Sequence, residues 1–193
     1  MARVFMDASL ALRGRLAVGG VPCNTFHAPA IFSRFESMLE EARVGIRIVD
    51  MLGESIGLLR SRLGVAGGRG EAVGVLSTTG TRSSGVYDAL LEEAGFKALY
   101  VPEVDQAALH ATIYDPGWGI KATPSPSDRA IESVTSFASG LVDAGAAAVI
   151  LACTELPLAL GGRTFRDVPL VDPVLALARA LVREAAPAKL KPI

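Results

Sequence analysis

The two cysteines of the chain, Cys23 and Cys153, each follow an apolar segment and are followed at once by polar residues. The apolar segments run over 16–22 and 147–152. An apolar run of this length, bounded by turn residues, predicts a buried parallel strand. Open α/β sheets bind their ligands at the carboxyl ends of such strands. We therefore expect both thiols at the edge of one site.

Several kinds of chemistry are open to two thiols that only the fold can bring together. A metal site needs more Cys or His ligands at ligand spacing, and of the two histidines only His27 is near a cysteine; we expect no metal. A Cys–His hydrolase with His27 as base stays open, because His27 follows Cys23 by four residues. A packing role also stays open, since a free cysteine behaves as a small hydrophobe.

The elements that must position these thiols alternate between strand and helix, which predicts an α/β fold with parallel sheets flanked by helices. Apolar periodicity predicts strands at 16–23, 44–49, 72–77, 98–101, 147–153 and 168–171. It predicts helices at 28–43, 51–63, 83–94, 107–114, 128–144 and 156–160, and a last helix that Asp172 caps.

A cluster of glycines at 64–70 predicts a connection between two lobes. The expected division is a first lobe over 1–70, a second lobe over 71–168, and a C-terminal strand and helix over 169–193 that return to the first lobe. The site would lie in the cleft between two pseudo-symmetric lobes, each a parallel sheet flanked by helices.

Composition narrows the class of protein. A chain of 193 residues with 50% hydrophobic residues is globular. Its net charge of -1 indicates no nucleic-acid partner and no membrane-surface partner. The longest apolar run is too short for a bilayer, and the first residues lack the core of a signal peptide. We expect a cytoplasmic protein, in which two cysteines are thiols rather than a disulfide.

Three segments carry a resemblance to a known family. Pro22-Cys23-Asn24-Thr25-Phe26-His27 resembles the first cysteine motif of the aspartate/glutamate racemases, and Ala152-Cys153-Thr154-Glu155-Leu156-Pro157-Leu158 resembles the second. Between them, Val73-Gly74-Val75-Leu76-Ser77-Thr78-Thr79-Gly80-Thr81 resembles the strand and loop that open the family's second lobe. Thr-Glu after the second cysteine is similar to the aspartate racemase branch, since glutamate racemases more often have a histidine there.

The resemblance implies racemisation of an acidic amino acid without pyridoxal phosphate or any other cofactor. One cysteine removes the α-proton as a thiolate, and the other protonates the opposite face as a thiol, so Cys23 and Cys153 would be catalytic. The implied substrate-binding residues are Asn24, Thr25, Thr78, Thr79, Gly80, Thr81, Lys121 and Thr154. Glu155 and His27 would be auxiliary, tuning Cys153 and supporting Cys23.

Less specific roles stay open for several of these residues. The Thr78–Thr81 loop could be a helix cap, Lys121 a solvated side chain, and Glu155 a favourable charge at a helix N-terminus. His27 could serve packing alone. His110 is expected on a helix surface.

The chain starts closer to its first cysteine motif than family members do, so we expect an N-terminally shortened member. The portion ahead of that motif normally supplies an arginine for the distal carboxylate, and no equivalent arginine is recognisable here. A homodimer is expected from the family and from a first lobe that is incomplete. The alternatives are a single-cysteine isomerase or decarboxylase of a related diacid, and a non-catalytic homologue that binds an acidic ligand.

Overall fold

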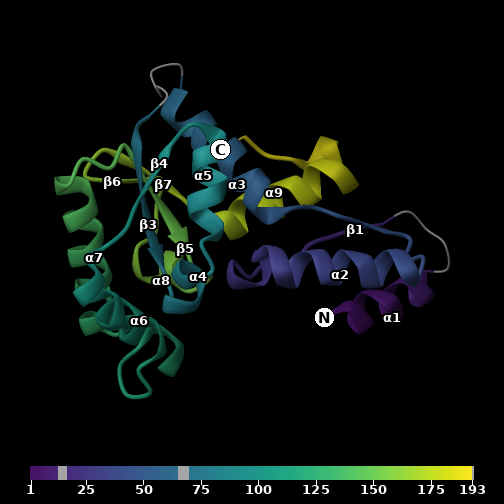
Figure 1. Cartoon of the computed structure of the whole chain (residues 1–193), viewed down its shortest axis with the longest axis horizontal. Coiled ribbons are helices and arrows are strands. Elements are labelled where there is room, and N and C mark those ends of the chain that lie inside the picture. Colours follow the sequence, from purple (N-terminus) through teal and green to yellow (C-terminus); the bar gives the residue numbers. More distant parts are fainter. Residues whose placement is uncertain (13–16, 65–69, 193) are drawn as a thin grey trace.

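A computed structural model describes residues 1–12, 17–64 and 70–192 of the chain, which form two parallel sheets with helices packed around them (Figure 1). The elements up to the glycine cluster are α1 (Ala2–Leu12), β1 (Ala17–Gly19), α2 (Pro29–Glu41), β2 (Ile46–Ile48) and α3 (Met51–Leu63). The elements that follow are β3 (Ala72–Ser77), α4 (Thr79–Ser83), α5 (Val86–Ala94), β4 (Lys97–Leu99), α6 (Gln106–Tyr114), α7 (Asp128–Asp143), β5 (Ala148–Ala152), α8 (Leu156–Ala159), β6 (Thr164–Phe165), β7 (Val168–Val171) and α9 (Pro173–Ala185). Short 3-10 helices lie at Thr25–His27, Glu103–Asp105, Ile120–Ala122 and Pro187–Lys189.

The larger sheet has the strand order β4-β3-β5-β7-β6. Its strands are parallel except β6, which runs antiparallel to β7 at one edge. The central strand β5 is fully buried, and β3 is buried after its first residue. One core packs α3, α5 and α9 against this sheet, and a second core packs α6, α7 and α8 against it. Because helices cover both faces, the two central strands are apolar at successive positions rather than at alternate ones.

The smaller sheet pairs β1 with β2 in parallel. α1 and α2 lie side by side next to it, away from the larger sheet (Figure 1). A separate core holds these elements together around Phe35 and Leu39 of α2, with Val21 buried in the same cluster. Phe26 and Phe32 add edge-to-face contacts to this core, with ring centroids 6.3 Å apart.

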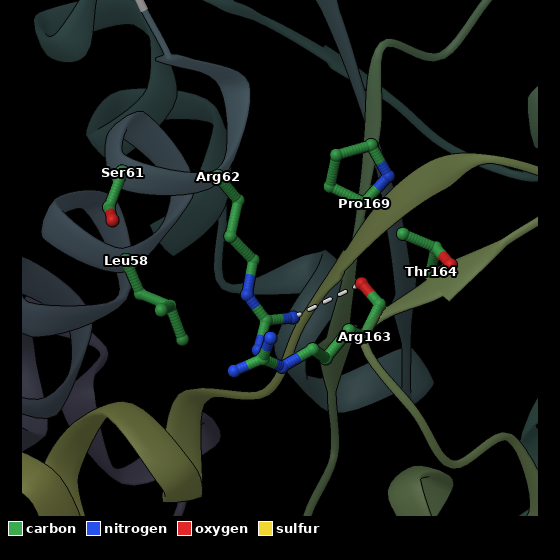
Figure 2. A pocket seen from close by; sticks show the side chains of 6 residues that line it. All are labelled: Leu58, Ser61, Arg62, Arg163, Thr164 and Pro169. Carbon is green, nitrogen blue, oxygen red and sulfur yellow. Dashed lines mark hydrogen bonds between the residues drawn. The ribbon is translucent and has the colours of Figure 1, made fainter. Parts of the chain in front are cut away.

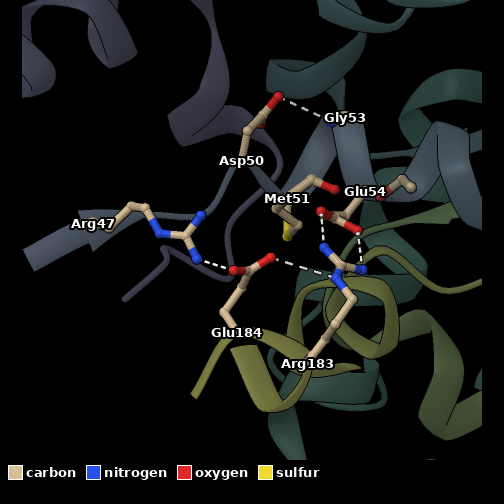
Figure 3. A network of polar contacts seen from close by, with 8 residues as sticks. Arg47, Asp50, Met51, Gly53, Glu54, Arg183 and Glu184 are labelled. Carbon is tan, nitrogen blue, oxygen red and sulfur yellow. Dashed lines mark hydrogen bonds and ion pairs between the residues drawn. The ribbon is translucent and has the colours of Figure 1, made fainter. Parts of the chain in front are cut away.

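The C-terminal helix α9 connects the two parts. A Cβ on Gly20 would lie 2.5 Å from Leu177 Cδ1, so a larger residue at this position would require the Leu177 side chain of α9 to move. Ion pairs extend the connection: Arg183 of α9 holds Glu54 of α3 at 2.6 Å, and Glu184 pairs with Arg47 of β2 (Figure 3). α9 thus contacts β1, β2 and α3, and the expected return of the last helix to a first lobe stays a prediction, like the lobes themselves.

The predicted α/β fold with parallel sheets flanked by helices is confirmed. The expected bounds of 51–63, 72–77 and 168–171 are those of α3, β3 and β7. The proposed lobe boundary falls largely on residues 65–69, which lie outside the described residues. α3 also packs against β7 and α9, so the division into lobes stays a prediction.

Two expectations were wrong in detail. The strand expected to reach Cys23 ends at Gly19, because the chain turns where Gly20 meets α9 and where the Cys23 N–H bonds the Val21 carbonyl at 2.9 Å. The helix expected at 83–94 is divided into α4 and α5. Gly85 separates them in a left-handed conformation with φ of 64°, which favours glycine.

Candidate active site

The carboxyl edge of the larger sheet brings two of the predicted segments together. Ser77 ends β3 and pairs with Ala152, the last residue of β5. The next residues, Thr78 and Cys153, therefore leave the sheet on adjacent strands. Threonine hydroxyls from one strand end and a thiol from the other share this edge, which is where parallel sheets place ligands.

The loop that carries Cys23 is docked onto the same edge. Thr25 Oγ1 lies 2.7 Å from Thr81 Oγ1, and the Tyr87 hydroxyl donates to Asn24 Oδ1 at 2.5 Å. Asn24, Thr81 and Tyr87 are all buried. The two residues after Cys23 are thus fixed to the larger sheet's helices, Asn24 to α5 and Thr25 to α4.

Tyr114 lies at the end of α6, next to Lys121. Burial raises the pKa of its phenol most, the charge of Glu155 raises it further, and the charge of Lys121 opposes both. Of the two thiols, Cys23 is exposed and Cys153 is 8% exposed.

Cys153 is held in its neutral form by its surroundings. Burial, followed by the hydrogen bond to Glu155, raises the pKa of the thiol to about 12. The thiol donates to Glu155 Oε2 at 2.9 Å, and the Thr154 hydroxyl donates to the same oxygen at 2.7 Å. A thiol with this pKa keeps its proton at neutral pH, so it can act as an acid.

The carboxylate of Glu155 is stabilised as an anion. Burial acts to raise its pKa, but hydrogen bonds from Cys153, Lys121 and Thr154 outweigh burial and lower it. Lys121 Nζ lies 2.5 Å from Glu155 Oε1, and this bond raises the pKa of the lysine. Lys121 also lies 5.3 Å from the centre of the Tyr114 ring. Lys121 is therefore paired with Glu155 beside Cys153 while its side chain remains exposed, and its role in substrate binding stays a prediction.

Three buried polar atoms near the cysteine loops have no hydrogen-bond partner within the described part of the chain. They are Asn24 Nδ2, in the residue after Cys23, His27 Nδ1, in the same loop, and Ser77 Oγ, in the last residue of β3. An unpartnered buried donor costs about 1–3 kcal/mol. A polar ligand at this edge would remove that cost, which supports the prediction that Asn24 binds substrate.

In the loop Thr78–Thr81, some residues cap a helix or are buried, and others are exposed. Thr78 Oγ1 caps α4 by accepting from the Thr81 N–H at 3.3 Å, so the capping alternative is real for Thr78. Thr81 connects Thr78 to Thr25 and is buried. Thr79 and Gly80 are exposed at the edge where β3 ends.

His27 supports the cysteine loop from within the protein. Its Nε2 lies 3.0 Å from the Val21 carbonyl oxygen, its Nδ1 lies 3.4 Å from Asp50 Oδ1, and its ring stacks on Phe32 at 4.4 Å. Both ring nitrogens thus face groups other than the Cys23 thiol. This arrangement favours a supporting role and weakens the Cys–His hydrolase alternative.

His110 belongs to the site, although the sequence placed it on a helix surface. Its Nδ1 accepts from the Thr79 N–H at 3.3 Å, and its ring stacks on Tyr114 at 4.8 Å. The spacing of four residues between His110 and Tyr114 was the available signal, because residues four apart share a helix face.

Over the described ranges, no group of three or more Cys, His, Asp or Glu side chains is arranged to hold a metal ion, and no helix is long and apolar enough to span a bilayer.

A family model described as Asp/Glu/Hydantoin racemase matches residues 21–181. The chain belongs to this family. Its fold is similar to an aspartate racemase from Picrophilus torridus, with a TM-score of 0.68 and 22% identity over 95% of this chain and 69% of that one. A putative Asp/Glu racemase from Yersinia pestis gives a TM-score of 0.71 at 20% identity, over 95% of this chain and 73% of that one.

A glutamate racemase from Francisella tularensis in complex with D-glutamate is also similar, with a TM-score of 0.62 at 19% identity. That match covers 98% of this chain and 65% of the glutamate racemase. At these identities the likeness concerns the fold. The predicted resemblance to the aspartate/glutamate racemases is confirmed by the family model and by these structures.

Proposed function

We propose that this protein racemises a small acidic amino acid, aspartate, glutamate or a relative, with Cys23 and Cys153 as the two proton-transfer groups and without a cofactor. The observation that carries the proposal is the neutral, partly enclosed thiol of Cys153 beside an edge onto which the Cys23 loop is docked. Membership of the Asp/Glu/Hydantoin racemase family supports the reaction class.

In one direction, the Cys23 thiolate takes the α-proton, and the C–H electron pair moves into the carboxylate to form a dianion. The Cys153 thiol then gives its proton to the opposite face of the carbon, which inverts the centre. Cys23 is left as a thiol and Cys153 as a thiolate, so the enzyme is now ready for the other enantiomer. A general base contributes about 10²–10⁴-fold, so stabilisation of the dianion by hydrogen bonds must supply most of the rate.

The surrounding residues have distinct roles in this proposal. Asn24 and Thr25, Thr78 to Thr81, and Thr154 bind the α-carboxylate, with the free Nδ2 donor of Asn24 as the best-supported contact. Lys121 meets the distal carboxylate from its position against Glu155. Glu155 orients the Cys153 S–H bond and, once the thiol has lost its proton, favours its return because two anions repel.

The test is exchange of the α-proton in deuterated water, followed by NMR together with optical rotation, for both enantiomers of aspartate and glutamate. The expected result is exchange and racemisation that Cys23→Ser and Cys153→Ser each abolish while the fold, checked by circular dichroism, is retained. Ser33→Ala on α2 is a control that leaves the rate unchanged, because Ser33 is exposed and the substitution keeps its carbonyl oxygen, which accepts from the Ser37 hydroxyl in the same helix. Absence of exchange with every acidic amino acid contradicts the proposal.

The alternatives give different results in the same experiment. A single-cysteine isomerase or decarboxylase would be inactivated by one of the two cysteine substitutions and hardly affected by the other. A non-catalytic homologue would be stabilised thermally by an acidic amino acid without exchange of its α-proton. A dimer is also part of the proposal, and sedimentation of the full chain measures it directly.

A further inference from the structure

A second cavity, remote from the cysteines, is lined by two arginines (Figure 2). Its volume is about 230 Å³, and Leu58, Ser61, Arg62, Arg163, Thr164 and Pro169 line it. Arg62 lies in the last turn of α3, and Arg163 precedes β6. The leucine and the proline form an apolar part of the wall, while the serine and the threonine add hydroxyl groups.

The cavity is separate from the proposed active site. Pro169 lies near the amino end of β7, and the next residue, Leu170, pairs with Val149 of β5. Cys153 is four residues farther along that chain, which corresponds to about 13 Å at the rise of a strand. Figure 1 shows β6 near one end of the larger sheet and α4 and α8 near the other.

Arg62 and Arg163 share with Arg34, Arg60 and Arg129 the lack of a carboxylate partner within the described ranges, whereas four other arginines have one. Arg47, Arg82, Arg166 and Arg183 each lie within 4.0 Å of a carboxylate. Within the described ranges, no such ion pair involves Arg62 or Arg163, and no carboxylate lines the cavity. The polar contact recorded between the two is the bond from Arg62 Nη1 to the Arg163 carbonyl oxygen at 3.4 Å, which is long.

The positive charges of Arg62 and Arg163 repel each other, which affects the pKa of Arg62. Burial and then the charge of Arg163 lower the pKa of Arg62, and the charge of Asp172 only partly opposes them. Asp172 Oδ1 is also engaged, because it accepts from the Val174 and Leu175 N–H groups as the cap of α9. Two guanidinium groups facing one cavity, without an anion between them, repel each other.

We propose that this cavity is a binding site for a small oxyanion, a phosphate or carboxylate group held between Arg62 and Arg163. Guanidinium forks match two oxygens of such a group and form charge-assisted hydrogen bonds with it. Ser61 and Thr164 can donate to the remaining oxygens. The bound anion would connect α3 to the β6–β7 edge and remove the repulsion between the arginines. The site does not depend on the racemase proposal.

Titration calorimetry and thermal unfolding of the full chain test the site, in chloride buffer of constant ionic strength, with inorganic phosphate and with succinate as separate probes. The expected result is saturable binding and a rise in melting temperature with concentration, as linkage requires. Arg62→Gln and Arg163→Gln each weaken binding by about tenfold or more, because each removes a charge-assisted contact. Arg166→Gln is the matched control and leaves binding unchanged, since Arg166 pairs with Asp143 and does not line the cavity.

The two probes distinguish the source of the anion. Binding of phosphate alone through the two arginines identifies a phosphate site, and binding of succinate alone or of both identifies a carboxylate or general oxyanion site. The glutamine variants are expected to fold, because each relieves a like-charge contact. Binding of neither anion to the wild type overturns the proposal, and so does binding that all three variants retain equally.

Discussion

Replacement of Glu155 by Gln should lower the pKa of Cys153. The pKa is raised to about 12, whereas an ordinary thiol titrates near 8.5, and the difference corresponds to about 5 kcal/mol in favour of the protonated form. Burial is the largest cause and the bond to Glu155 is the second. Because the Glu155 carboxylate stabilises the protonated thiol, Glu155→Gln should lower the pKa of Cys153 while burial keeps it above that of an ordinary thiol.

The assay is alkylation of Cys153 by iodoacetamide as a function of pH, in a Cys23→Ser background so that one thiol reacts. Near pH 9 the thiolate population, and with it the alkylation rate, should be higher in Glu155→Gln than in the parent protein. Glu132→Gln, an exposed carboxylate on α7, is the matched control and should have no effect. Greater accessibility alone would raise the rate by the same factor at every pH.

A midpoint of the alkylation profile that stays the same or rises in Glu155→Gln would refute this reasoning. It would mean that burial alone protonates Cys153, and Glu155 would then be a packing residue. The racemase proposal would lose the group that returns the proton to Cys153, although the two thiols could still act.

Three further predictions follow from the contacts. Tyr87→Phe should cost about 1–3 kcal/mol in urea unfolding and slow racemisation, because the buried Asn24 Oδ1 loses its donor. Wild type should lose stability relative to Cys153→Ala as pH rises from about 8.5 toward 10. The unfolded thiol ionises there while the folded one keeps its proton, with a slope of up to about 1.4 kcal/mol per pH unit. Glu54→Gln should cost at most about 1 kcal/mol through its exposed pair with Arg183, and the cost should vanish in high salt when both proteins are compared by chemical unfolding.

The sequence predicts best where hydrophobic period and capping residues agree. The α3 helix has its Asp50 cap, and Asp50 accepts from the Leu52 and Gly53 N–H groups, so its first residue is fixed locally. β3 is an apolar run bounded by polar residues, so both of its ends were predicted as they are. Asp172 likewise caps α9 as expected.

The errors arise where distant contacts decide the local structure. β1 ends at Gly19, and the next residue, Gly20, packs against Leu177 from the other end of the chain. The residues around Gly20 do not predict this contact. His110 and Tyr114 were missed as site residues for a similar reason. The face of α6 that carries His110 and Tyr114 contacts Thr79 and Lys121, which are distant in the sequence and come close only in the folded chain.

The sequence predicts which residues lie near the two thiols, but it does not predict which side chains contact one another. Cysteine followed by small polar residues indicates a strand-end site, and the family resemblance gave Asn24, Lys121 and Glu155 roles. The sequence contains no information on which oxygen of Glu155 meets Cys153, or on Tyr87 as the partner of Asn24. Those contacts depend on side chains from separate helices meeting at one edge.

The docking of the Cys23 loop has a consequence for how this protein tolerates change. Because Thr25 and Asn24 are fastened to α4 and α5, the spacing of the two sulfurs is governed from the larger sheet, not by the two short strands that precede Cys23. Insertions, deletions or substitutions on the outer side of α1 and α2 should thus alter solubility and assembly long before they disturb proton transfer. The same contacts make Tyr87, which touches no substrate in the proposal, a position where a modest change would move a reacting atom.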